Sequence, residues 1–183
     1  MRGFDLLAEG ATTATTCFFL AGMLAGAFLD LKTRRIPNAL TVTAVVAGLV
    51  FRAPLGLHAV AGGLLGVSLA LLLAAPLFML GALGGGDVKL LAGAGAFLGP
   101  KQLVGACLLI ALLGGVFALA EAIRKGALRA LLLNVFYMMS RWWSPDRRNL
   151  APTLVPPVRM TIPYGVPIAV GALAWWFWGG NVI

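Results

Sequence analysis

The chain has 183 residues, of which 61% are hydrophobic and 11% charged, and its formal net charge is +8. A water-soluble domain carries about 25% charged residues, so the composition excludes an ordinary soluble globular protein. The basic residues stand between apolar runs, where they typically set membrane topology, and this argues against nucleic-acid binding. We therefore predict an all-α, polytopic membrane helical bundle that forms a single domain over residues 1–183, with the lipid bilayer as its surroundings.

Six apolar runs are predicted to be transmembrane helices, each of which needs about 20 residues to cross the hydrocarbon core. They cover residues 11–29, 39–51, 59–80, 88–98, 103–120 and 162–178. The second run is short but can be extended by Asn38 and Arg52. The fourth would rise only about 16 Å at 1.5 Å per residue. It must therefore begin before Asp87, tilt, or stop part-way across among its neighbours.

The last run ends in a cluster of tryptophans, which is typical of the boundary between hydrocarbon and headgroups. The cluster comprises Trp175, Trp176 and Trp178. The preceding segment, residues 126–160, repeats apolar residues at helical spacing and continues as a basic, proline-rich stretch. It predicts an amphipathic helix in the cytoplasmic interface. A seventh span is the alternative, which Asn134 and the flanking charges disfavour.

The distribution of basic residues predicts the orientation of the bundle. With the N-terminus outside, 11 of the 14 basic residues fall in cytoplasmic segments. The remaining three are Arg2, Arg52 and Lys101. Cytoplasmic loops carry the excess of Lys and Arg, so this orientation is favoured over its reverse.

Two aspartates are expected at the same membrane edge in this topology. Asp30 ends the first span as it reaches the cytoplasm, and Asp87 opens the fourth as it leaves the cytoplasm. Carboxylates at membrane depth are costly and usually functional. When two of them share a site, one can act as a base and the other as an acid, and together they can activate water without a metal. The alternative is that each aspartate pairs with a nearby base, Asp30 with Arg34 and Asp87 with a lysine.

A glycine-rich turn precedes the second aspartate. Gly84, Gly85, Gly86 and Asp87 have the form GxGD. Glycines without a Cβ allow a sharp turn and allow a substrate strand to lie close to the aspartate. If Asp87 opens a helix, the helix dipole favours its charged form.

With these motifs the sequence resembles the type IV prepilin peptidases, a family of GxGD membrane aspartic proteases. The first matching motif, D-x-K-x-R-R-I-P-N, runs from Asp30 to Asn38, and the second runs from Gly84 through Asp87 and Lys89 to Gly95. A third, weaker match covers residues 162–171. No usable match is found for residues 126–160.

The resemblance implies that Asp30 and Asp87 are the catalytic pair of a site that removes prepilin leaders at the cytoplasmic face of the bacterial inner membrane. Many members of the family carry an added methyltransferase region with paired CxxC motifs. The cysteines here, Cys17 and Cys107, form no such motif. The chain is therefore similar to the short, peptidase-only branch that serves Flp pili of tight-adherence systems. No methylation, metal or other cofactor is expected.

Several residues near the aspartates are predicted to bind the prepilin substrate. The basic side chains can hold an acidic substrate residue just past the cut, and the glycines can approach its backbone. The predicted set is Gly84, Gly85, Gly86, Lys89, Arg34 and Arg35. For Lys89 a purely topological role is an equal alternative.

Two other function classes remain as alternatives. Intramembrane proteases of the presenilin type share GxGD, but they also have a tyrosine–aspartate pair and a proline-alanine-leucine motif. Here Leu29 precedes Asp30, and no such proline motif follows Asp87. The non-enzyme alternative is a transporter or assembly subunit whose aspartates move protons, and its mark would be acidic residues deeper within the spans.

Overall fold

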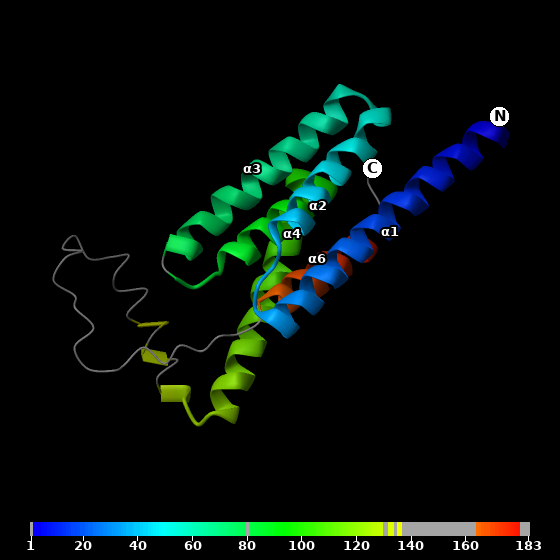
Figure 1. The fold of residues 1–183 in the computed structure, drawn as a ribbon. Coiled ribbons are helices and arrows are strands. Elements are labelled where there is room, and N and C mark those ends of the chain that lie inside the picture. Colours follow the sequence, from blue (N-terminus) through cyan, green and yellow to red (C-terminus); the bar gives the residue numbers. More distant parts are fainter. Residues whose placement is uncertain (1, 80, 130–131, 134, 137–163, 180–183) are drawn as a thin grey trace. The chain divides into compact units, whose positions relative to one another are not determined.

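The computed structural model describes residues 2–79, 81–129, 132–133, 135–136 and 164–179, with side chains from residue 12 onward (Figure 1). The chain forms two compact units, residues 1–113 with 163–183 and residues 114–162. Every element in the described residues is helical. They are α1 (Arg2–Thr33), α2 (Asn38–Arg52), the short 3₁₀ helix η1 (Ala53–Leu55), α3 (Leu57–Met79), α4 (Gly85–Arg124) and α6 (Gly165–Trp178).

Four of the described helices are long and apolar enough to cross a membrane. These spans are Thr12–Thr33, Asn38–Leu55, Leu57–Met79 and Gly85–Arg124, and α6 is a shorter apolar helix. Large apolar side chains such as Phe28, Val46 and Leu72 are exposed on these helices. A soluble protein rarely exposes so much contiguous apolar surface, whereas lipid covers it at no cost. The prediction of an all-α membrane bundle is confirmed.

The helix bounds follow the predicted runs closely at the two aspartate motifs. α2 spans Asn38–Arg52, so the polar residues at both ends extend the short second run as expected. Pro37 precedes it in an extended conformation and sets the start of α2. α4 starts at Gly85, two residues before Asp87, as the length of the fourth run required.

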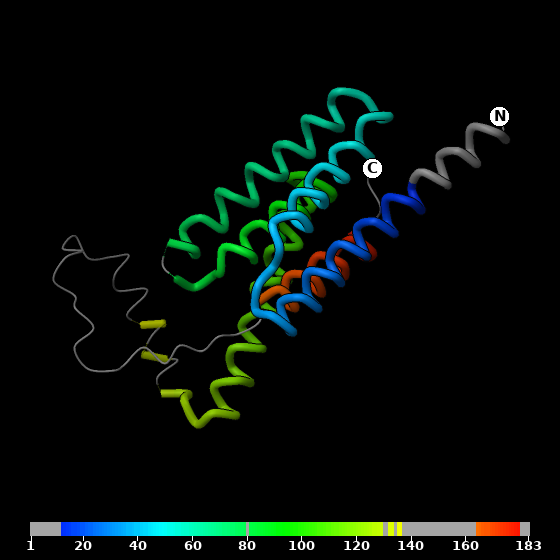
Figure 2. The backbone as a smooth tube through the Cα atoms, in the orientation of Figure 1, coloured from blue at the N-terminus to red at the C-terminus, as the bar shows by residue number. Residues whose placement is uncertain are grey.

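α4 contains a break at Gly99 that divides it into two arms. Gly99 has φ 72° and ψ 174°, which no helix accommodates, and Pro100 follows it. Glycine adopts positive φ without the penalty that other residues meet, so the break between the predicted runs 88–98 and 103–120 is built on this residue. The backbone tube of Figure 2 bends back here. With the two arms counted separately, the described helices supply the six predicted apolar segments.

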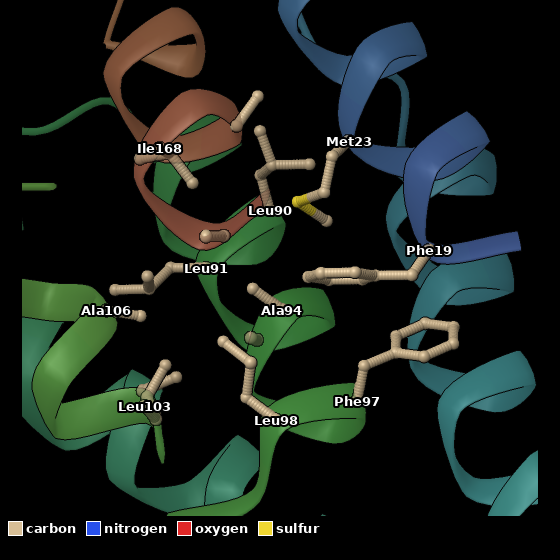
Figure 3. Close-up of a cluster of buried hydrophobic side chains, with 14 of the residues drawn as sticks. Phe19, Met23, Leu90, Leu91, Ala94, Phe97, Leu98, Leu103, Ala106 and Ile168 are labelled. Carbon is tan, nitrogen blue, oxygen red and sulfur yellow. The ribbon is translucent and has the colours of Figure 1, made fainter. Parts of the chain in front are cut away.

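Contacts between α1 and the first arm of α4 fix their register. Phe19 of α1 stacks on Phe97 with ring centroids 5.1 Å apart, and a Cβ on Gly26 would lie 2.7 Å from a methyl group of Leu90. From 19 to 26 is seven residues forward, and from 97 to 90 is seven residues back. The two helices therefore run antiparallel, level with one another. Their buried side chains form the core shown in Figure 3.

Small residues bring the other helices close to α4. A methyl group on Gly66 of α3 would overlap the Gly95 carbonyl, and one on Gly48 of α2 would lie 2.8 Å from the Ala96 Cβ. A methyl on Gly171 of α6 would lie 2.5 Å from Ile110 in the second arm. In lipid, no hydrophobic effect drives helices together. They associate instead through the close backbone contacts that small residues allow.

The tryptophans of α6 differ from the predicted headgroup cluster. Trp176 is buried, with its ring centroid 4.9 Å from that of Phe19 in α1, and Trp178 is exposed. The prediction was wrong for Trp176, because α6 lies against α1 (Figure 1) and this face of the helix enters the core.

The second unit is described only in part. Within it Glu121 forms ion pairs with Arg124 and Lys125, each at 2.9 Å. Most of the predicted amphipathic segment, residues 126–160, lies outside the described residues.

Candidate active site

Asp30 lies in the last turn of α1 and is buried, with 8% of its surface exposed. Its Oδ2 accepts a hydrogen bond of 2.9 Å from the backbone N–H of Gly165. Gly165 is the first residue of α6, where backbone N–H groups have no partner within their own helix. The positive end of the α6 dipole therefore faces the Asp30 carboxylate.

Gly165 is required by the closeness of this contact. A Cβ at this position would lie 2.8 Å from the Asp30 Cβ and 2.9 Å from its Oδ2. Both distances are well below van der Waals contact, about 3.5–4.0 Å between carbons. A side chain here would therefore displace the aspartate from the end of α6.

Asp87 caps the helix on which it lies. It is the third residue of α4, is 9% exposed, and its Oδ2 accepts a hydrogen bond of 3.0 Å from the Gly84 N–H. An acidic residue at this position reaches back to the residue before the helix, as in one half of a capping box. The GxGD turn thus fixes the orientation of its own aspartate.

The register of α1 and α4 brings the two aspartates to the same level. Asp30 is four residues beyond Gly26, and four residues back from Leu90 is Gly86, the neighbour of Asp87. Because Gly26 packs on Leu90 in an antiparallel pair, the carboxylates meet at one end of the bundle. They are close enough for the charge on Asp30 to act on Asp87.

The segment between α1 and α2 contacts the GxGD turn at two points. Ile36 is buried, and a Cβ on Gly86 would lie 3.1 Å from the Ile36 Cβ. The Lys89 Nζ donates a hydrogen bond of 2.7 Å to the Asn38 Oδ1. The two sequence motifs therefore form one structure, and Lys89 bonds an amide instead of pairing with Asp87.

The predicted basic residues Arg34 and Arg35 are exposed at the same end of the bundle as Asp30. Arg34 has φ 54°, in the left-handed region, and its N–H bonds the Asp30 carbonyl at 2.9 Å as α1 ends. The Thr33 hydroxyl bonds the Leu29 and Arg35 carbonyls at 2.8 and 2.9 Å. A hydrogen-bonded turn therefore holds the backbone of these two exposed arginines just after Asp30.

The three glycines before Asp87 have different surroundings. Gly84 is exposed and Gly86 packs on Ile36. A Cβ on Gly85 would meet only Phe78, at an ordinary 3.6 Å. A Cβ on Gly84 would lie 3.0 Å from the Asp87 Oδ2 and one on Gly86 3.1 Å from the Ile36 Cβ, whereas Gly85 has room for a methyl group.

Comparison with known proteins agrees with this arrangement. A profile of the type IV leader peptidase family matches residues 17–119, more than half of the chain and both aspartate motifs. The chain belongs to the type IV leader peptidase family. Comparisons with curated proteins and with solved structures give no significant match.

Membership of this family, together with the apolar helices, makes the chain a membrane-embedded peptidase. The matched residues end before α6, so the match does not include Gly165, the hydrogen-bond partner of Asp30. Gly165 falls within the weak third match at residues 162–171, and the sequence did not predict it as a site residue. A glycine at the start of an apolar run is a weak signal, because the residue that it accommodates is 135 positions away.

Arg52 is a second residue whose position the sequence did not predict. It was counted among the outer basic residues but is 7% exposed. Its guanidinium donates to the carbonyls of Ala96 at 2.9 Å, Phe97 at 2.6 Å and Ala59 at 3.3 Å. It therefore caps the first arm of α4 just before the Gly99 break, at the end opposite Asp87.

No group of three potential metal ligands occurs in the part of the chain that the structure describes. The site there consists of two carboxylates, helix N-termini and exposed cations. Such a set suits proton transfer to and from water.

Proposed function

We propose that this chain is an aspartic endopeptidase that removes the leader of Flp-like type IV prepilins at the cytoplasmic face of the inner membrane. Asp30 and Asp87 activate the water, without a metal or other cofactor. The observation that carries the proposal is the level placement of two buried carboxylates, each oriented by an N–H at a helix N-terminus.

The chemistry follows from two carboxylates that share one proton. The ionised carboxylate takes a proton from water, and the hydroxide adds to the scissile carbonyl carbon. The protonated carboxyl then gives its proton to the amide nitrogen as the carbon–nitrogen bond breaks. The products are the leader with a free carboxyl group and the mature pilin with a free amine.

The location of the site suits a prepilin. Such a substrate carries a basic leader in the cytoplasm joined to an apolar helix in the bilayer, so its scissile bond lies at the membrane boundary. Asp30 and Asp87 lie at helix ends, beside the exposed Arg34, Arg35 and Lys89. The positive charge at this end supports a cytoplasmic orientation. Arg52, at the opposite end, is buried and adds little charge to the outer surface.

Substrate selection is assigned to the exposed groups around the carboxylates. Arg34 and Arg35 attract an acidic residue just past the cut, and Gly84 and Gly85 leave space for the substrate backbone. Gly86 supports the turn through Ile36, and Lys89 orients Asn38. Methylation of the product is not part of the proposal, since the sequence has no paired CxxC motif.

The experiment co-expresses a prepilin with the wild type, Asp30→Asn or Asp87→Asn, and reads the pilin N-terminus by mass spectrometry. Each variant is expected to insert normally and to abolish processing. Glu121→Gln is the matched control, because it makes the same chemical change at an exposed ion pair in the other unit. Processing by either inserted aspartate variant, or inhibition by EDTA that metal reverses, would contradict the mechanism.

The position of the cut distinguishes the alternative proteolytic function. A cut after a small residue at the end of the leader supports a prepilin peptidase. A cut deep within the apolar helix would instead indicate an intramembrane protease of the presenilin type. Intact prepilin in wild-type cells would favour the non-enzymatic transporter or assembly subunit.

A further inference from the structure

The exposed part of the GxGD turn is bounded by the side chain of Phe78. Phe78 lies in the last turn of α3 and is 52% exposed. A Cβ on Gly85 would lie 3.6 Å from the Phe78 Cε2, which is ordinary van der Waals contact. The edge of the ring therefore rests against the turn two residues before Asp87, although Phe78 belongs to neither aspartate motif.

Phe78 is held beside the turn by the hydrogen bonds that end α3. The Gly81 N–H donates to the Phe78 carbonyl at 2.9 Å, and the Ala82 N–H donates to the Leu77 carbonyl at 2.8 Å. With Gly81 at φ 74°, these two bonds form the Schellman motif that commonly ends a helix. Main-chain geometry therefore fixes where the ring stands relative to the glycines that follow.

A peptide can approach Asp87 over the exposed part of its turn. Ile36 covers the other part, since a Cβ on Gly86 would lie 3.1 Å from the Ile36 Cβ. Gly84 is exposed instead, and its N–H bonds the Asp87 Oδ2 at 3.0 Å. A strand that reaches Asp87 therefore crosses the Gly84 side of the turn.

The spacing along the turn matches the spacing along a bound strand. The Asp87 carboxylate contacts Gly84, and the Phe78 ring contacts the next residue, Gly85. Neighbouring Cα atoms are about 3.8 Å apart, and successive residues of a strand rise by about 3.3 Å. When the scissile carbonyl is at Asp87, a residue that flanks the cut is therefore level with Phe78.

The proposed function sets the direction of the strand. Arg34 and Arg35 follow Asp30 in the chain, and they are assigned to the acidic residue just past the cut. Phe78 contacts the turn of the other aspartate. The residue level with the ring is therefore on the leader side of the scissile bond.

We propose that the Phe78 ring contacts the last residue of the prepilin leader and limits its size. The ring already touches the glycine turn, so a branched side chain between them has to displace one or the other, whereas glycine fits. Forcing extra methyl groups into a filled apolar contact is unfavourable. Phe78 is then a specificity-determining residue of the peptidase and takes no part in the bond-breaking steps. The inference rests on the proposed function.

The test compares wild type, Phe78→Ala and Phe78→Trp in proteoliposomes, on synthetic prepilin peptides whose leader ends in glycine, alanine or valine. The kcat/KM for each peptide is divided by that for the glycine peptide. Phe78→Ala is expected to raise the valine-to-glycine ratio about 10-fold or more, the factor by which small changes of size in an apolar subsite alter kcat/KM. Phe78→Trp, with its larger ring, is expected to lower the alanine-to-glycine ratio.

Phe177→Ala is the matched control for a general loosening of the bundle. Phe177 is 61% exposed near the C-terminus of α6, and the same truncation there is expected to leave both ratios at the wild-type values. A second peptide series varies the residue just after the cut, where Phe78→Ala is expected to change nothing.

Three results would overturn the role of Phe78 while leaving the peptidase intact. One is a valine-to-glycine ratio for Phe78→Ala that equals the wild-type ratio, and another is an equal rise in Phe177→Ala. The third is relaxed selection after the cut instead of before it. If Phe78→Ala cleaves no peptide, an unchanged alanine-to-glycine ratio for Phe78→Trp rejects the contact. Failure of the wild type to cleave the glycine peptide would overturn the proposed function, and the role of Phe78 would fall with it.

Discussion

Gly165→Ala tests whether the start of α6 positions Asp30. The new methyl group would lie 2.8 Å from the Asp30 Cβ, so the two must separate by about 1 Å to reach ordinary contact. A displacement of this size at a reacting group costs about 10²-fold in rate. Gly165 does not need positive φ, and alanine favours a helix over glycine by about 1 kcal/mol, so the backbone itself tolerates the change.

The assay is the initial rate of prepilin cleavage by purified protein, with thermal unfolding in the same detergent as the test of folding. Gly165→Ala is expected to lower the rate about 100-fold with little loss of Tm. Gly22→Ala in α1 is the matched control, because its methyl group meets nothing nearer than the Ala44 Cβ at 4.0 Å. A Gly165→Ala rate within about three-fold of wild type would refute the idea that this contact holds Asp30 in place.

Three further predictions follow from other contacts. Arg52→Met leaves the carbonyls of Ala96 and Phe97 without their donor and should destabilise the protein by about 2–5 kcal/mol, measured by thermal unfolding in detergent; an unchanged Tm would contradict the capping role. Gly86→Ala should reduce cleavage more than Gly85→Ala, because only the former brings a methyl group against Ile36. Equal rates would show that the contact between Gly86 and Ile36 does not affect the site. Gly85→Cys should resist a membrane-impermeant thiol reagent outside intact cells but react in inverted vesicles, and the opposite labelling would reverse the orientation.

The sequence determines the membrane character and most helix bounds through local physics. Apolar runs of sufficient length specify helices in lipid, because every backbone polar group must be bonded within the segment. Pro37 sets the start of α2, and the Gly99–Pro100 pair breaks α4, through backbone geometry alone. The two aspartates could be assigned to one membrane edge for the same reason, since each lies at a predicted helix end.

Packing details could not be read from the sequence in the same way. Trp176 had a plausible place at the headgroups, yet it packs on Phe19, 157 positions earlier in the chain (176 − 19). Arg52 had a plausible place outside the membrane, yet it bonds carbonyls that only the break at Gly99 leaves without helical partners. In both cases a distant segment decides the environment, and no local pattern reports it.

The site shows the same division. Residue type, spacing and the family resemblance were enough to predict Asp30, Asp87 and the glycines before Asp87 as site residues. The orientation of the aspartates was not predictable, because the donor to Asp30 is the backbone of Gly165, which any residue type possesses. A hydrogen bond from a main-chain N–H cannot be predicted from residue type. Its only sign in the sequence is a glycine where the backbone contacts the aspartate. Only the antiparallel packing of α1 against α6 reveals that this glycine lies against Asp30.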